Sequence, residues 1–177
     1  MPTGDPDTRF RTAQLMLGVL QTTHQHADAK AGILAATQAA LVTATVTWSG
    51  RSVHGWQRGG GAGLLAGLLL ALFAVGLLVG APALALALRP RVWRPAGPNV
   101  YSFRGLSTGP DVLPADPAAH ALPDEAEERR ELAEAVRFLA GVAVLKYRWL
   151  TVSLVGTALM AASSGLSLLL RPWLGTP

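Results

Sequence analysis

The sequence contains no cysteine and few charged residues. Without cysteine there can be no disulfide framework, no thiolate nucleophile and no cysteine-based metal site. Charged residues make up 15% of the 177 residues and hydrophobic residues 50%, whereas a soluble globule needs a more highly charged surface. Residues 1–7 carry Asp5 and Asp7 before any cation and lead into no short apolar core, so no secretory signal peptide is expected.

Three long segments have no charge at all and predict membrane-spanning helices. Residues 31–48 are just long enough, at about 27 Å of helix, although they are rich in threonine. Residues 62–88 are the most apolar stretch, and residues 150–170 form the last one. We therefore expect an all-α membrane protein with three transmembrane helices.

Two of these spans are preceded by segments with helical patterning. Residues 1–30 predict a cytoplasmic amphipathic helix that runs without a breaker into the first span. Residues 124–149 predict a second cytoplasmic helix, because acidic residues fill its first turns and complement the helix dipole. The first and third transmembrane helices should thus extend into the cytoplasm.

The remaining segments predict connections. Residues 49–61 are polar and glycine-rich, which is typical of a turn, here on the outer side of the membrane. Residues 89–123 hold seven of the twelve prolines and predict an extended cytoplasmic loop. Residues 171–177 form an outer tail.

The basic residues indicate the orientation. A sequence pI near 10.3 suggests either nucleic acid or membrane as a partner. With the amino terminus inside, twelve of the fifteen Lys and Arg residues are cytoplasmic, and only Arg51, Arg58 and Arg171 lie outside. This bias favours a membrane protein with a cytoplasmic amino terminus, and no nucleic acid as a partner.

The sequence shows no catalytic constellation, so we expect no enzyme and no cofactor. The histidines His24, His26, His54 and His120 are scattered, and the two close ones do not share a helix face. Because a zinc site needs three or four convergent ligands, no metal site is predicted.

Small residues at helical spacing predict helix packing or assembly. Two glycine steps in the second span, separated by about half a turn, face opposite ways. This suits a different neighbour at each end, or one neighbour within the chain and one in another protomer of a homo-oligomer. The alternative is that a span rich in Leu, Ala and Gly shows such spacings by chance. A third stripe lies in the last span. The residues are Gly63, Gly67, Gly76, Gly80, Thr157, Ala161 and Gly165.

Polar residues near the helices offer further contacts. Gln38 and Thr45 share one face of the first span, where they either hydrogen-bond a neighbouring helix or line a wet path in an oligomer. Asp28 and Lys146 precede the first and third spans at a similar depth. They predict an ion pair that clamps the two long helices, unless each cation simply extends to the lipid headgroups.

The start of the cytoplasmic loop interleaves cations with aromatic residues. Such a set can hold an anionic ligand by charge-assisted hydrogen bonds and stacking, and it equally suits anionic lipid headgroups. The residues are Arg89, Arg91, Trp93, Arg94, Tyr101, Phe103 and Arg104.

The order of four short motifs resembles the membrane effector family of Pycsar antiphage systems. A D-x-K-A motif falls on Asp28, Lys30 and Ala31 at the mouth of the first span. A P-R run after the second span falls on Pro90 and Arg91. A short N-x-x-x-F patch falls on Asn99 and Phe103, and the lysine before the last span is Lys146. The proline-rich stretch 106–123 departs from the family, whose members are often more helical there.

The resemblance implies a defence effector. A partner cyclase would sense phage and make cyclic CMP or cyclic UMP, and the effector would then damage the inner membrane and cause abortive infection. The candidate nucleotide-binding residues are Asp28, Lys30, Arg91, Arg104 and Lys146. The alternative is a ligand-free membrane scaffold or accessory subunit that binds anionic lipid or a partner protein.

Overall fold

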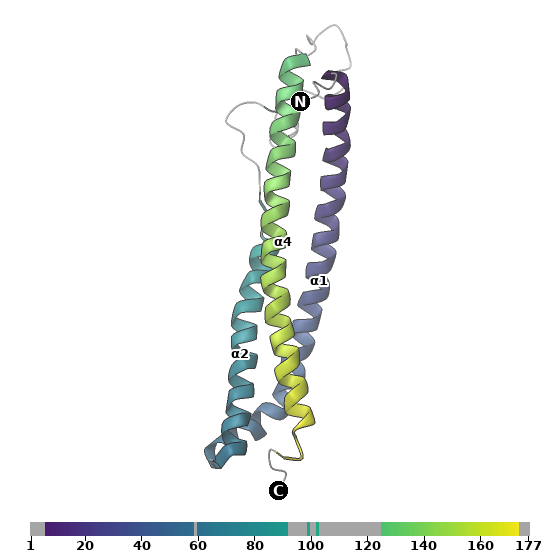
Figure 1. Cartoon of the computed structure of the whole chain (residues 1–177). Helices are drawn as coiled ribbons and strands as arrows, with labels where there is room; N and C mark the ends of the chain where they lie inside the picture. Colours follow the sequence, from purple (N-terminus) through teal and green to yellow (C-terminus); the bar gives the residue numbers. More distant parts are fainter. Residues whose placement is uncertain (1–5, 59, 92–98, 100–101, 103–124, 174–177) are drawn as a thin grey trace. The chain divides into compact units, whose positions relative to one another are not determined.

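The structure, a computed structural model, describes residues 6–58, 60–91, 99, 102 and 125–173. They form three helices, α1 (Pro6–Arg58), α2 (Gly60–Leu88) and α4 (Glu125–Leu169), and no strand occurs in these ranges (Figure 1). Each helix is long and apolar enough to cross a membrane. The predicted all-α fold with three membrane-spanning helices is therefore confirmed.

Helix α1 joins the predicted amphipathic segment to the first span in one helix of 53 residues. The predicted turn at 49–61 is wrong over most of its length, because the helix continues to Arg58. Glycines lower helix propensity by about 1 kcal/mol each but do not end a helix, and this stretch has no proline. Gly60 begins α2 with a φ of 84°, a left-handed conformation that glycine adopts without steric cost.

Helices α2 and α4 follow their predicted bounds closely. Helix α2 continues through Pro82 to Leu88, as transmembrane helices tolerate when neighbouring groups satisfy the freed backbone. Helix α4 joins the predicted cytoplasmic helix to the third span in 45 residues. Near its start, Arg130 Nε and Glu134 Oε1 form an i,i+4 ion pair at 3.3 Å.

The chain divides into two compact units. The first contains Met1–His26 and Pro90–Leu145, and among its described residues the buried apolar positions are Leu132, Ala135 and Ala143. The second contains Ala27–Arg89 and Lys146–Pro177, and so holds the apolar parts of all three helices.

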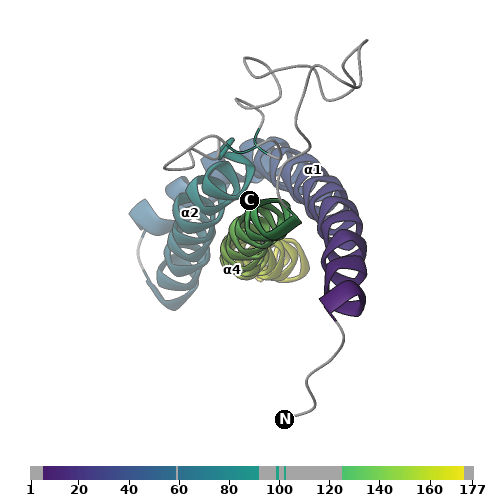
Figure 2. The ribbon, with the colours of Figure 1, turned by 90° about the horizontal axis from the view of Figure 1, so that it is seen from above.

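In the second unit α1 and α4 run parallel, and α2 runs antiparallel to both. Hydrogen-bonded side chains of α1 and α4 lie a nearly constant 115 to 119 positions apart in the sequence, so both helices advance in the same direction. Figures 1 and 2 show α2 and the second half of α1 beside the second half of α4. An apolar cluster joins the three helices at one end of the unit, made of Ala27, Ala31, Leu84, Ala87 and Leu150.

The outward positions of this unit are apolar and exposed. Ile33 of α1, Leu78 of α2 and Leu154 of α4 are 68%, 73% and 56% exposed. If this surface faced water, exposure of such side chains would cost about 25 cal/mol per Å² of apolar area. Their positions suit contact with lipid tails, while the polar residues described below are buried inside.

Candidate functional site

An ion pair joins α1 and α4 at the start of the second unit. Lys146 Nζ donates a hydrogen bond to Asp28 Oδ1 at 2.5 Å. The lysine side chain is 14% exposed and the aspartate side chain 52%. The predicted clamp between the two long helices is thus confirmed, and it presents its carboxylate to the surroundings.

A second contact between the same helices lies beside the ion pair. Lys30 Nζ stands 5.8 Å from the centroid of the Tyr147 ring, within the range of a cation–π interaction. Both side chains are exposed. Two lysines from different helices, one aromatic face and one carboxylate therefore lie together, a set that can hold a small planar anion by charge and stacking.

The apolar cluster lies directly next to these charges. Leu150 follows Lys146 by one helical turn, and Ala27 and Ala31 flank Asp28 and Lys30 on α1. Because apolar side chains exclude water, charge interactions at this border are stronger than on an open surface. Arg89, exposed, ends the same unit just after α2. We call Asp28, Lys30, Lys146 and Tyr147 the charged mouth.

The five candidate nucleotide-binding residues do not all meet in the described structure. Asp28, Lys30 and Lys146 come together in the charged mouth. Arg91 belongs to the first unit. Arg104 lies outside the described residues, as do Trp93, Arg94, Tyr101 and Phe103.

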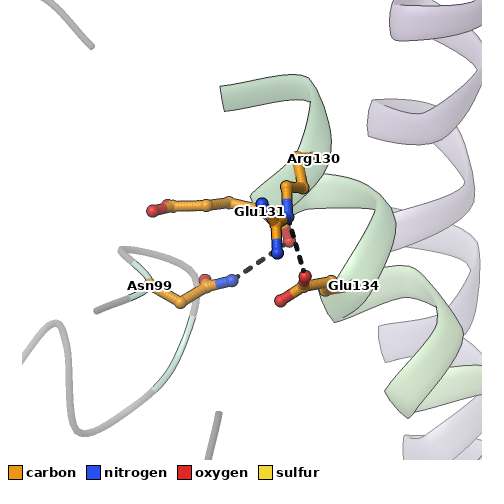
Figure 3. Close-up of polar contacts among 4 residues, drawn as sticks. All are labelled: Asn99, Arg130, Glu131 and Glu134. Carbon is orange, nitrogen blue, oxygen red and sulfur yellow. Dashed lines mark hydrogen bonds and ion pairs between the residues drawn. The ribbon is translucent and has the colours of Figure 1, made fainter. Parts of the chain in front are cut away.

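Asn99 has a structural contact that sequence reasoning missed. Its Nδ2 donates to the backbone carbonyl of Glu131 on α4 at 3.3 Å, next to the Arg130–Glu134 ion pair (Figure 3). Ser102 donates to the Asn99 carbonyl from both Oγ, at 2.8 Å, and its backbone N, at 3.1 Å. Asn99 and Ser102 are 3% and 2% exposed. This motif residue thus fixes the loop to α4 within the first unit.

The two histidines near the end of the first unit differ in burial. His24 Nε2 is buried, and it has no hydrogen-bond partner within the part of the chain that the structure describes. His26 is exposed. No group of three or more potential metal ligands occurs among the described residues.

Glycines bring α2 and α4 into backbone contact. A Cβ built on Gly76 would stand 2.8 Å from the Gly156 carbonyl oxygen, and one built on Gly156 would stand 2.7 Å from Gly80 Cα. Real Cβ atoms essentially never approach so closely. The predicted step Gly76–Gly80 therefore packs within the chain, against Gly156, which sequence reasoning missed.

The other small-residue predictions have mixed outcomes. A Cβ on Gly67 would meet the Trp56 ring at 3.3 Å, so this step faces α1, and the two glycine steps have different neighbours within one chain. Only part of the α4 stripe packs within this chain, and its role in assembly stays a prediction. Thr157 is buried, but Ala161 is exposed and no described atom lies within 4 Å of a Cβ built on Gly165. Ser153 and Gly156, one turn apart, form the packed face, a spacing visible in the sequence.

A polar seam runs between α1 and α4. Gln38, 5% exposed, donates from Nε2 to Thr157 Oγ1 at 2.8 Å and to Ser153 Oγ at 3.2 Å. Further along, Thr45 Oγ1 and Ser164 Oγ lie 3.5 Å apart. These contacts confirm that Gln38 and Thr45 reach a neighbouring helix. The seam is defined as Gln38, Thr45, Ser153, Thr157, Ser163, Ser164 and Ser167, all buried.

Comparison with known proteins gives one assignment. A family model described as the Pycsar effector protein domain matches residues 12–171. No curated protein and no solved structure matches the chain. The match spans nearly the whole chain and includes all three apolar helices. The chain therefore belongs to the Pycsar effector family, and it is a multi-pass membrane effector of antiphage defence.

Proposed function

We propose that the chain is activated by a cyclic pyrimidine mononucleotide, cyclic CMP or cyclic UMP, which binds at the charged mouth and causes loss of inner-membrane integrity. The single observation behind this proposal is the Asp28–Lys146 ion pair, whose lysine is mostly buried and whose carboxylate is half exposed. The protein acts without catalysis, as the switch and the damaging agent in one chain. Family membership supports the defence role.

The ligand competes with a carboxylate already in place. A cyclic nucleotide phosphate carries one negative charge, as Asp28 does, and it can replace that carboxylate as the partner of Lys146. Lys30 adds a second cation, and the exposed face of Tyr147 suits stacking of a pyrimidine base. Releasing Asp28 removes the clamp between α1 and α4. The nucleotide can shift the protein toward the released state only by as much as it binds that state more tightly than the clamped state.

Titration calorimetry on the protein in nanodiscs tests binding. Cyclic CMP and cyclic UMP are each injected, with cyclic AMP as a purine control. We expect heat with one or both pyrimidine nucleotides, and a loss of roughly tenfold or more in affinity for Lys146→Met, because charge-assisted hydrogen bonds contribute about 1.5–3 kcal/mol. Arg148→Met, which removes an exposed cation two residues away, is the matched control and should bind normally.

Dye-reported depolarisation of cells tests the consequence of binding. Cells that express the protein and receive the cyclase product should depolarise, and cells expressing Lys146→Met should not. Retained polarisation with the parent protein well expressed, or no heat with either pyrimidine nucleotide, contradicts the proposal. Both results together favour the ligand-free scaffold.

A further inference from the structure

The polar seam is long enough to extend across much of the hydrocarbon core of a bilayer. On α4 it extends from Ser153 to Ser167, and Lys146 lies two turns before it. The 21 residues between Lys146 and Ser167 correspond to about 32 Å of helix, which matches the roughly 30 Å of a bilayer's hydrocarbon core. The helix thus carries polar groups on its buried face over most of that thickness.

Several hydroxyls of the seam, including some that also contact the other helix, hydrogen-bond to the backbone of their own helix. Thr157, Ser163 and Ser167 each donate to a carbonyl of their own helix four residues earlier, all at 2.8 Å. Thr45 does the same on α1, at 2.7 Å. Among the described residues, contacts across the helices come from Gln38 and from the distant Thr45–Ser164 approach. Alanine would pack equally closely at these serines without burying a hydroxyl.

The self-satisfied hydroxyls are suited to hydration. Each keeps free acceptor capacity while its proton stays on the helix backbone, so it can bind water as soon as the helices separate. The same helix carries exposed Leu154, Val155 and Leu168, which suit lipid. Polarity in α4 is therefore concentrated on its buried side, where Ser153, Thr157 and Ser164 face α1.

In the present state the seam is closed by apolar packing. Met160, between Thr157 and Ser163 in the sequence of α4, has 0% exposure and contacts Gly76 of α2, whose Cβ would meet Met160 Cγ at 2.9 Å. At the end nearest the ion pair, Leu150 is enclosed in the apolar cluster. These two constrictions keep a neutral, hydroxyl-rich path from filling with water.

We propose that the polar seam lines the route by which water and small ions cross the membrane once α1 moves away from α4. The lining is neutral, because residues 150–170 contain no charged side chain, so the route should pass small ions without strong selection by charge. This inference rests on the proposed function, since ligand binding at the charged mouth supplies the helix separation. It goes beyond that function by assigning the damage to named residues.

The absence of native cysteine allows a direct test. Single variants Ser164→Cys and Ser167→Cys place a thiol in the seam, while Leu154→Cys and Leu168→Cys place one on exposed outward faces of the same helix. Vesicles containing each variant receive a membrane-impermeant trimethylammonium methanethiosulfonate, with and without cyclic CMP or cyclic UMP. Modification is measured by mass spectrometry and depolarisation by dye, in parallel.

We expect the seam thiols to be modified roughly tenfold faster after the nucleotide is added, because the reagent attacks the thiolate, which forms only in contact with water. The thiols at positions 154 and 168 should keep the slow rate of modification that they show without the nucleotide. Depolarisation with unmodified seam thiols overturns this inference and leaves the proposed function standing. Equal modification of seam and outward thiols overturns it as well, by indicating general loss of the bundle. Absence of depolarisation in the cysteine-free parent overturns both proposals.

Discussion

Helices α2 and α4 approach each other closely at Gly156, because glycine has no side chain to keep them apart. We predict that Gly156→Ala lowers the free energy of unfolding by about 1–3 kcal/mol, the usual cost of overpacking a tight interface. The reason is that its Cβ would stand 2.7 Å from the Gly76 carbonyl oxygen, and backbone atoms cannot turn aside. Unfolding in mixed detergent micelles measures the change.

Gly165→Ala is the matched control for this substitution. It lies in the same helix, and no described atom lies within 4 Å of the position of its new Cβ. The control should be neutral or slightly stabilising, since alanine favours the helix. Equal losses in the two variants would mean that α2 and α4 are not packed as described.

The Asp28–Lys146 ion pair makes a separate prediction at the same scale. We expect a double-mutant cycle with Asp28→Asn and Lys146→Met to show a coupling energy of about 0.5–1 kcal/mol, the upper part of the range for exposed pairs. The value stays small because the aspartate side chain is 52% exposed. Thermal unfolding of the four proteins in detergent provides the cycle.

Salt distinguishes this pair from a simple packing effect. The coupling should fall as ionic strength rises, because screening acts on the exposed carboxylate. A coupling near zero at low salt would show that each group acts alone, as expected if Lys146 merely reached the lipid headgroups.

At the scale of helices, α1, α2 and α4 meet where Gly80 leaves room for Gln38. A Cβ on Gly80 would stand 2.9 Å from Gln38 Nε2, the far end of a flexible side chain. We predict that Gly80→Ala costs about 1 kcal/mol in the parent protein, by displacing an amide whose hydrogen bonds are worth about that much. In a Gln38→Ala background the same substitution should cost close to nothing.

Gly76→Ala is the control for this suppression. Its new Cβ would meet the backbone oxygen of Gly156 at 2.8 Å, a contact that Gln38 does not influence. Its cost should therefore persist in the Gln38→Ala background, as measured by the same unfolding experiment. Rescue of both glycine variants would show that Gln38→Ala loosens the whole bundle instead.

The helices themselves were predictable from the sequence because long uncharged runs have few alternatives. The extent of α1 was not, since glycines in 49–58 resemble a turn although nothing there forces the helix to end. The α4 packing face within the chain was also predicted only in part. The prediction followed Thr157, Ala161 and Gly165, whereas the neighbour's position selects Ser153 and Gly156, and only the fold supplies that position.

The candidate site was predictable to the extent that helix geometry determines it. Asp28 and Lys146 precede spans of similar depth, so parallel helices bring them together. The role of Asn99 was hidden, because it depends on a contact with Glu131, which lies far away in the sequence. Short motifs indicated that Asn99 mattered, but they did not indicate an anchor on α4.

At the scale of the whole second unit, the proposed nucleotide site and the polar seam lie on one pair of parallel helices. The ion pair stands at one end of the α1–α4 interface, and the polar seam continues along it. In the proposed mechanism, loss of the clamp at Asp28 would loosen the α1–α4 contact that covers the seam. This arrangement gives a physical reason for a signal at the membrane surface to affect the membrane interior.

The orientation of the whole chain provides the last prediction. Three crossings place the two termini on opposite sides, and twelve of the fifteen Lys and Arg residues fall on the side of the amino terminus. Alkaline phosphatase, which is active only outside the cytoplasm, should therefore be active when fused after Pro177 and inactive when fused before Met1. A green fluorescent protein fused at the same points should give the reverse pattern. Phosphatase activity at the amino terminus would invert the topology and place the charged mouth on the side where no cytoplasmic nucleotide reaches it.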